Sequence, residues 1–168
     1  MTRTVDSYRF VSVATRRMVQ SWLKLDSPGD TPWTPLSKPL SDCTIALIST
    51  GGIALRTDEP FDQERERRNP WWGDPSYRVI PRTATSDDIR VYHLHIDPSH
   101  AEKDLNCLLP IERLSEMANE GVVGRAAPSH YSFMGYLLDP REFLEDSVPA
   151  IIRRMGDESV DVVVLVPA

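Results

Sequence analysis

Two short runs of apolar, strand-forming residues constrain the fold more than any other feature of the sequence. They are CTIALI at residues 43–48 and DVVVLV at residues 161–166. Neither run alternates polar with apolar residues, and such near-continuous runs are typical of strands buried on both faces of a parallel sheet. Helices must then cover both faces, so the sequence predicts an α/β architecture.

The remaining periodic segments fit this architecture. Residues 89–96, IRVYHLHI, predict another strand. One helix is predicted between Pro110 and Gly121, because proline is favoured in a first helical turn and glycine just past a helix end. Another is predicted from Ser147 to Gly156. The alternation predicts a mainly parallel open sheet with flanking helices, doubly wound as in Rossmann or flavodoxin-like folds.

The N-terminal part has a different character. A helix is predicted over residues 7–24, and prolines follow it, so residues 1–40 are predicted to form an N-terminal helix and a proline-rich arm. Residues 41–168 are predicted to form the α/β domain, which we expect to be incomplete at its C-terminus. Residues 56–88 and 125–140 lack clear periodicity and predict long loops.

Charge and composition exclude several classes of partner. The chain has 168 residues and a net charge of -6. Nucleic acids and anionic membranes bind basic surfaces, so neither is expected as a partner. The sequence has no apolar run of bilayer-spanning length and no signal-peptide core at its start, so we expect a cytoplasmic protein. Its two cysteines, Cys43 and Cys107, are too few for a disulfide framework and are predicted to be inert, buried thiols.

Histidines dominate the candidate chemical groups. His93, His95 and Asp97 alternate at the end of a predicted strand, and a period of two would place them on one face. Such a row could bind a divalent metal or transfer protons; alternatively, Asp97 caps a turn and the histidines pack locally. His130 lies in a predicted loop that could reach the same rim, in either a binding or a structural role.

Two further pairs are binding candidates. Gly51 and Gly52 follow the predicted strand 43–48, where glycine permits either a tight turn or close approach to a ligand. Trp71 and Trp72 lie in the long predicted loop, where they could cover a cleft or simply pin the loop.

Several ordered stretches together resemble one family. They are SYRFVSVATRRMVQSW, PWTPLSKPLSDCTIALISTGGIAL, NPWWGDPSYRVIPR, HIDPSHAEKDLNCLLPIERL and VDVVVLVPA. The stretches resemble the selenoprotein B subunits of the glycine, sarcosine, betaine and D-proline reductases, nearest to the D-proline reductase branch. This resemblance implies thiol- or selenol-dependent reductive cleavage of a small amino acid or amine. It also implies reductase partner subunits, one of them pyruvoyl-bearing in the D-proline branch, and a thiol reductant protein.

The resemblance further implies a redox selenocysteine or cysteine directly after the last strand. A selenol is largely ionised at neutral pH, and the ionised form is the nucleophile, as it is for thiols. The sequence given ends at Ala168, so we expect the chain to be truncated before the redox motif, for instance at a UGA codon read as a stop. Selenocysteine is accordingly expected in the full-length protein, and enzymatic activity of this chain stays uncertain at this point.

Three functional hypotheses remain open from the sequence. The first is a selenoprotein-B-type reductase subunit or fragment. The second is a non-catalytic relative that binds a small molecule or a partner subunit. The third is a metal-dependent enzyme built on His93, His95 and Asp97. A sheet left bare on one side would also favour self-association, so a homo-oligomer is compatible with each hypothesis.

Overall fold

The computed structural model describes residues 12–23, 34–69 and 72–168. The chain divides into two compact units, residues 1–35 and 36–168. In the first unit, α1 (Val13–Leu23) forms a helix inside the predicted range 7–24. The hydroxyl of Ser12 accepts a hydrogen bond from the amide of Thr15 at 3.1 Å, which satisfies one of the free donors at the start of α1.

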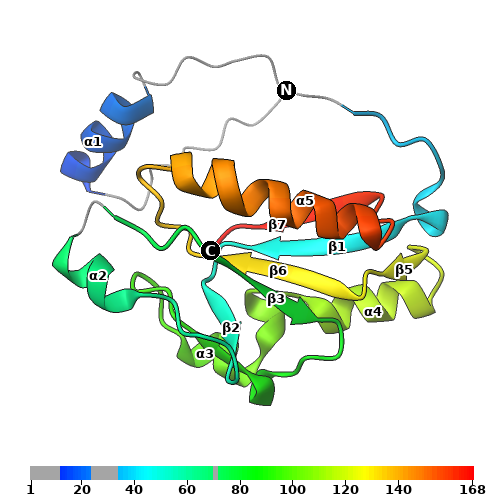
Figure 1. Ribbon diagram of the computed structural model, residues 1–168. Helices are drawn as coiled ribbons and strands as arrows, with labels where there is room; N and C mark the ends of the chain where they lie inside the picture. Colours follow the sequence, from blue (N-terminus) through cyan, green and yellow to red (C-terminus); the bar gives the residue numbers. More distant parts are fainter. Residues whose placement is uncertain (1–11, 24–33, 70–71) are drawn as a thin grey trace. The chain divides into compact units, whose positions relative to one another are not determined.

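The second unit is built on one mostly parallel sheet with β1 (Thr44–Ser49) inside it. β7 (Val162–Val166) pairs in parallel along one side of β1. β5 (Arg125–Ala126) and β6 (Ser129–Phe133) pair in parallel with successive parts of its other side. β3 (Tyr77–Pro81) completes the sheet as an antiparallel neighbour of β6, and its arrow runs opposite to the others in Figure 1. The predicted α/β class and mainly parallel sheet are confirmed.

Several predicted boundaries were wrong. The strand predicted at 89–96 is only β4 (Ile89–Val91), and it pairs antiparallel with β2 (Ile53–Leu55) in a separate two-stranded sheet. The predicted loop 56–88 contains β3, and the predicted loop 125–140 contains β5 and β6. These segments carry polar residues and prolines, so they do not show the apolar runs by which the buried strands were identified.

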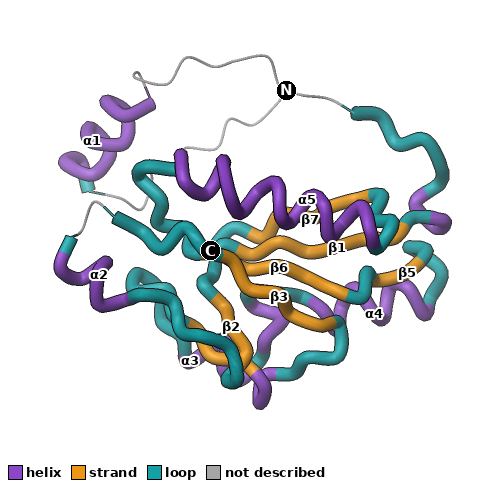
Figure 2. The backbone as a smooth tube through the Cα atoms, viewed as in Figure 1, coloured by secondary structure: helices purple, strands orange, loops and turns teal. Residues whose placement is uncertain are grey.

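Helices and short turns connect the strands (Figure 2). The α-helices of the second unit are α2 (Gln63–Arg68), α3 (Ser99–Lys103), α4 (Ile111–Asn119) and α5 (Val148–Asp157). Single-turn elements are the 3₁₀ turns η1 (Leu40–Asp42), η2 (Ser86–Asp88) and η3 (Leu105–Cys107), and the π-helical turn η4 (Phe143–Ser147). None of the helices in the described ranges is long and apolar enough to cross a bilayer.

Two apolar clusters hold the sheet between its helical layers (Figure 1). On one face, Ile151 and Met155 of α5 pack with Ala46 and Tyr131 of the sheet. The other face carries the larger cluster, in which side chains of β1, β2 and β4 meet those of α4 and the segment before it. Each fully buried aliphatic side chain contributes on the order of 2 kcal/mol, so both faces of β1 are held firmly.

α5 passes through a proline without ending. Pro149 lies in the first turn of α5, directly after the π turn, where the regular i→i−4 hydrogen-bond ladder is already interrupted. The preceding π turn is closed by the amide of Val148, which donates to the carbonyl of Phe143. The predicted helix from Ser147 to Gly156 therefore differs from α5 by one residue at each end, and its start is the point where π geometry changes to α geometry.

β7 forms as predicted but is not buried. Val163, Val164 and Leu165 are 38%, 42% and 71% exposed, although successive residues of a strand face opposite sides of the sheet. Both faces of β7 are thus largely uncovered in the middle of the strand, whereas Val162 packs against the larger core cluster. The apolar run is that of an interior strand, yet within the described residues β7 lies at the edge and pairs only with β1.

Candidate functional site

The parallel strands end at one rim, and backbone bonds tie their ends together. The amide of Thr50, just past β1, donates to the carbonyl of Val166 at 3.2 Å. The Thr50 carbonyl accepts from the amide of Gly135, just past β6, at 2.9 Å. The Thr50 hydroxyl accepts from the amide of Ala168 at 2.8 Å. The carboxyl ends of β1, β6 and β7 therefore converge on Thr50, at the edge where open α/β sheets bind ligands.

Gly51 and Gly52 both lie at this rim, and their close neighbours are protein groups. Gly52 has φ +60, and a Cβ there would overlap the sulfur of Met134 and lie 3.2 Å from the amide nitrogen of His93. A Cβ on Gly51 would lie 3.0 Å from the side chain of Leu108. A tight, closely packed turn accounts for both glycines.

His93 and His95 also reach the rim, but not as a row on a strand. The chain leaves β4 after Val91 and turns, so the predicted strand face does not exist. The rings of His93 and His95 are 5.8 Å apart and nearly perpendicular. Burial, followed by the neighbouring His95, lowers the pKa of His93. Asp97 is exposed, and its carboxylate accepts from the amide of Ser99 at 2.9 Å, which is the turn-capping role.

No metal centre forms from these groups. Across the part of the chain that the structure describes, no three side chains of His, Cys, Asp or Glu are gathered for an ion. His93, His95 and Asp97 lie at alternate positions of a turning segment, and the Asp97 carboxylate already accepts from the amide of Ser99. The predicted metal row depended on a strand that the structure does not contain.

The most unusual group near the rim is Glu66, which no sequence pattern indicated. It lies on α2, and its side chain is only 3% exposed. Within the described residues, neither of its carboxylate oxygens has a hydrogen-bond partner. Burial raises the pKa of Glu66. His95 Nε2 lies 3.5 Å from Glu66 Oε1, and the His95 ring lies 4.7 Å from that of Tyr136.

These side chains line a small hollow of about 190 Å³. Its lining residues are Glu66, Arg67, Leu94, His95 and Tyr136. Tyr136 comes shortly after β6. His95 comes two residues after His93, whose backbone lies beside Gly52 at the rim. The hollow therefore adjoins the segments that form the rim. A titratable group with a perturbed pKa in a concave site is a functional candidate on physical grounds.

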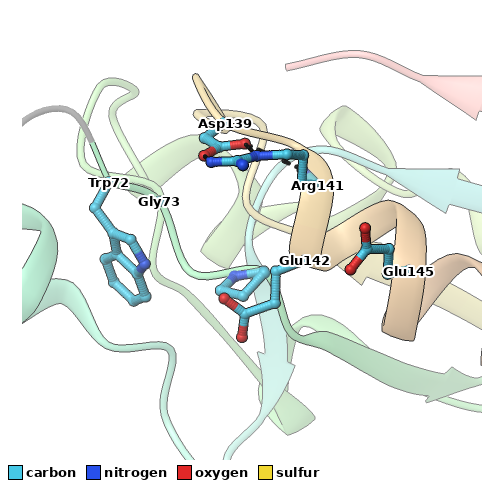
Figure 3. Close-up of a pocket in the computed structure, with 7 residues that line it drawn as sticks. Trp72, Gly73, Asp139, Arg141, Glu142 and Glu145 are labelled. Atoms are coloured by element: carbon cyan, nitrogen blue, oxygen red, sulfur yellow. Dashed lines mark hydrogen bonds and ion pairs between the residues drawn. The ribbon is translucent and has the colours of Figure 1, made fainter.

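Trp72 lines a second hollow, of about 310 Å³ (Figure 3). The guanidinium of Arg65 stacks 4.1 Å from the centroid of the Trp72 ring. Across the hollow, Arg141 pairs with Asp139, and this pairing lowers the pKa of Asp139 to about 2. Three carboxylates line this hollow, those of Asp139, Glu142 and Glu145. Trp71 lies outside the described residues.

His130 is placed inside the sheet and not in a loop. It lies on β6, is completely buried, and accepts a hydrogen bond from the amide of Leu47 at 3.1 Å. Leu47 sits between the points where β5 and β6 pair with β1, a gap that Pro128 helps to create because proline has no N–H. Burial lowers the pKa of His130 to about 4. The imidazole thus replaces a missing backbone partner.

The two cysteines lie outside the strands of the sheet, one just before β1 and one in η3. Cys43 is buried before β1, with its sulfur 3.3 Å from the carbonyl oxygen of Pro39. Cys107 is exposed in η3, so its predicted burial was wrong. In the described chain, neither thiol lies directly after β1, β6 or β7.

Comparison with known proteins adds information that the geometry lacks. The family model described as glycine/sarcosine/betaine reductase selenoprotein B matches residues 20–168. The D-proline reductase subunit gamma of Acetoanaerobium sticklandii is 37% identical over 133 residues, which are 79% of this chain and 52% of that protein. No solved structure matches.

Two components of related complexes are also similar. The glycine reductase complex component B subunit gamma of Carboxydothermus hydrogenoformans is 32% identical over 62% of this chain and 23% of its own length. The betaine reductase complex component B subunit beta of Peptoclostridium acidaminophilum is 31% identical over 58% of this chain and 22% of its own. The chain thus spans about half of the first relative and under a quarter of the others. Because the family model covers most of its residues, the chain belongs to the glycine/sarcosine/betaine reductase selenoprotein B family.

Proposed function

We propose that this chain forms part of a selenoprotein-B-type reductase subunit that acts in the reductive cleavage of a small amino acid or amine. The observation that carries the proposal is the family match over residues 20–168. The similarity to a protein named D-proline reductase subunit gamma supports the D-proline branch in particular.

The proposed reaction is a two-electron reduction. One C–N bond of the substrate breaks, the carbon and the nitrogen each gain a hydrogen, and a thiol–selenol pair is oxidised to a selenosulfide. A thiol reductant protein would return the pair to its reduced form, and reductase partner subunits would complete the assembly. The redox selenocysteine or cysteine would directly follow a strand of the rim, a position that neither Cys43 nor Cys107 holds in the described chain.

In this proposal, residues 36–168 supply the scaffold and the binding rim. The convergence of three strand ends at Thr50 supports a ligand site at that edge. His93 and His95, beside the rim, would contact the ligand or its surroundings, whereas Asp97 and His130 would serve the fold. A non-catalytic, partner-binding role is the second candidate, because the relatives are named as subunits or components of reductases.

The test is an activity assay on the native protein purified from its source with its associated subunits. We expect dithiol-dependent cleavage of at least one of D-proline, glycine, sarcosine and betaine, with the ring-opened or deaminated product identified by mass spectrometry. Cys107→Ala should retain this activity. Absence of cleavage of all four compounds would favour the non-catalytic role, and loss of activity in Cys107→Ala would reassign the redox thiol. Sequencing the gene past the Ala168 codon would test whether a redox selenocysteine or cysteine follows.

A further inference from the structure

The hollow beside Glu66 carries a chemical signature that its packing does not explain. A buried carboxylate normally accepts hydrogen bonds or pairs with a cation, because burial without partners costs several kcal/mol. Glu66 is 3% exposed, and both of its oxygens lack hydrogen-bond partners in the described chain. Its neighbour Asp74 shows the ordinary arrangement, accepting from the amides of Asp62 and Ser76 at 2.8 and 2.9 Å.

The nearest cationic candidate does not satisfy this carboxylate. His95 Nε2 lies 3.5 Å from Glu66 Oε1, beyond the usual range for an N–H···O hydrogen bond. The His95 side chain is 55% exposed, so it stands at the mouth of the hollow and not inside it. Both oxygens are closed to water as the side chains lie here, so a ligand group reaches them only where the exposed His95 ring moves away from the mouth of the hollow, whose volume is about 190 Å³.

We propose that this hollow binds the positively charged nitrogen of a small ligand, with the Glu66 carboxylate as its counter-ion. An ammonium donates to the unpartnered oxygens, and such charge-assisted hydrogen bonds are stronger than neutral ones. Tyr136, whose ring lies 4.7 Å from that of His95, also lines the hollow. Arg67 lines the same hollow from an exposed position, so a ligand carboxylate could pair with its guanidinium.

This inference deepens the proposed function, on which it rests for the class of ligand. Typical ligand pockets have volumes of roughly 300–1,000 Å³. This hollow is smaller, so it suits a ligand the size of an amino acid or a small amine. The charged groups facing Glu66 are His95, Asp74 and Arg67. Since burial raises the pKa of Glu66, a cationic ligand should bind its ionised form and lower that pKa.

The experiment compares ligands that differ in one charged group, using the 168-residue protein. D-proline carries both charges, pyrrolidine carries only the ammonium, and tetrahydrofuran-2-carboxylate carries only the carboxylate. Ligand-observed NMR titration measures binding of each. We expect saturable binding of D-proline and pyrrolidine with Kd at or below about 1 mM, the upper end of ordinary substrate constants. We expect no binding of tetrahydrofuran-2-carboxylate.

Two variants assign the binding to Glu66. Glu66→Gln keeps the shape and removes the charge, and it should weaken pyrrolidine binding roughly tenfold or more. Glu64→Gln is the matched control, because Glu64 lies on the same helix, is 72% exposed and pairs with Arg68. It should leave binding unchanged. Thermal unfolding of both variants checks that each is folded.

Equal binding of pyrrolidine to the wild type and to Glu66→Gln would overturn the inference. So would equal binding of tetrahydrofuran-2-carboxylate and D-proline, or no binding of any probe. If Glu66→Gln does not fold, the wild type decides the matter: affinity for pyrrolidine must rise as the pH rises through the pKa of Glu66, and a pH-independent affinity would refute the site. None of these measurements needs the redox residue. A failure of catalysis is therefore distinguishable from a failure of binding.

Discussion

His95 Nε2 lies 3.5 Å from Glu66 Oε1, too far for a hydrogen bond, while the Glu66 side chain is 3% exposed. The pair is therefore close without being satisfied. Removing one partner of a well-formed buried ion pair is strongly destabilising. Removing the Glu66 carboxylate breaks no hydrogen bond within the described residues, so its loss should destabilise the fold little. Its presence costs stability, as groups kept for binding often do.

Replacing Glu66 with methionine should consequently stabilise the protein. Glu66→Met removes two unpartnered oxygens at similar volume, so the free energy of unfolding at pH 7 should rise by about 1–2 kcal/mol. The raised pKa of Glu66 means that its folded-state penalty grows as the pH rises above the unfolded value, so the gain should shrink toward pH 4. Urea denaturation measures both. Glu64→Met, at an exposed position, should change stability by less than about 0.5 kcal/mol.

His130 should make stability fall in mild acid. Burial lowers its pKa from 6.5 to about 4, so the unfolded chain binds this proton more readily between those values. Stability should thus decline as the pH falls from about 6.5 to about 4, by up to about 3 kcal/mol from this group. The variant His130→Asn, whose amide oxygen can still accept from Leu47, should be less stable at pH 7 but have a flatter profile. An unchanged slope in that variant, or a flattened slope in the exposed control His100→Asn, would contradict the assignment.

Gly52 should tolerate a methyl group far less well than Gly121. Both have positive φ, of 60 and 73, so alanine costs roughly 1–2 kcal/mol at either position. A Cβ on Gly121 meets nothing within 4 Å, whereas a Cβ on Gly52 overlaps the Met134 sulfur. We expect Gly121→Ala to lose about 1–2 kcal/mol and Gly52→Ala about 2–5 kcal/mol, since overpacking adds roughly 1–3 kcal/mol. Equal losses in chemical denaturation would show that crowding at the rim has no effect.

The exposed edge strand should govern self-association of this chain. Leu165 on β7 is 71% exposed beside an unpaired strand edge, and charged residues on such edges block edge-to-edge pairing. Leu165→Lys should shift the protein toward monomer in sedimentation velocity experiments. Ile152→Lys on α5, where the side chain is 62% exposed, removes a similar apolar group away from the edge and should have a smaller effect. A monomeric wild type at high concentration would refute the prediction.

The α/β class and the two helices beside the sheet were predictable because they depend on local signals. The run at 43–48 could hardly be anything but an interior strand, and Pro110 and Gly121 bracket α4 closely. β3 was not predictable, because YRVIP includes an arginine and a proline and forms a strand only by pairing with β6, some fifty residues later. The apolar character of 161–166 predicted its strand but not its exposure, which depends on what lies beside it.

The site was less predictable than the fold for a related reason. Glu66 lies in the sequence QERERR, where its neighbours are charged and exposed, and nothing local distinguishes it. In the fold it shares a hollow with His95 and Tyr136, which come from other parts of the chain. The row of His93, His95 and Asp97 misled because alternation implies a shared face only while a strand continues. His130 was a candidate binding residue by its type alone. Pro128, two residues earlier, was the available sign that a strand is interrupted there.

Gly52 has one consequence that reaches beyond its own turn. Its amide donates to the carbonyl of Phe133 in the main sheet at 3.0 Å, and its carbonyl accepts from the amide of Tyr92, beside β4, at 2.8 Å. The residue thus belongs to the hydrogen-bond networks of both sheets. In hydrogen exchange, the amides of Gly52 and Tyr92 should open together as one cooperative unit and not fray independently. Solvent would then reach the backbone of the rim only through an event that loosens both sheets at once.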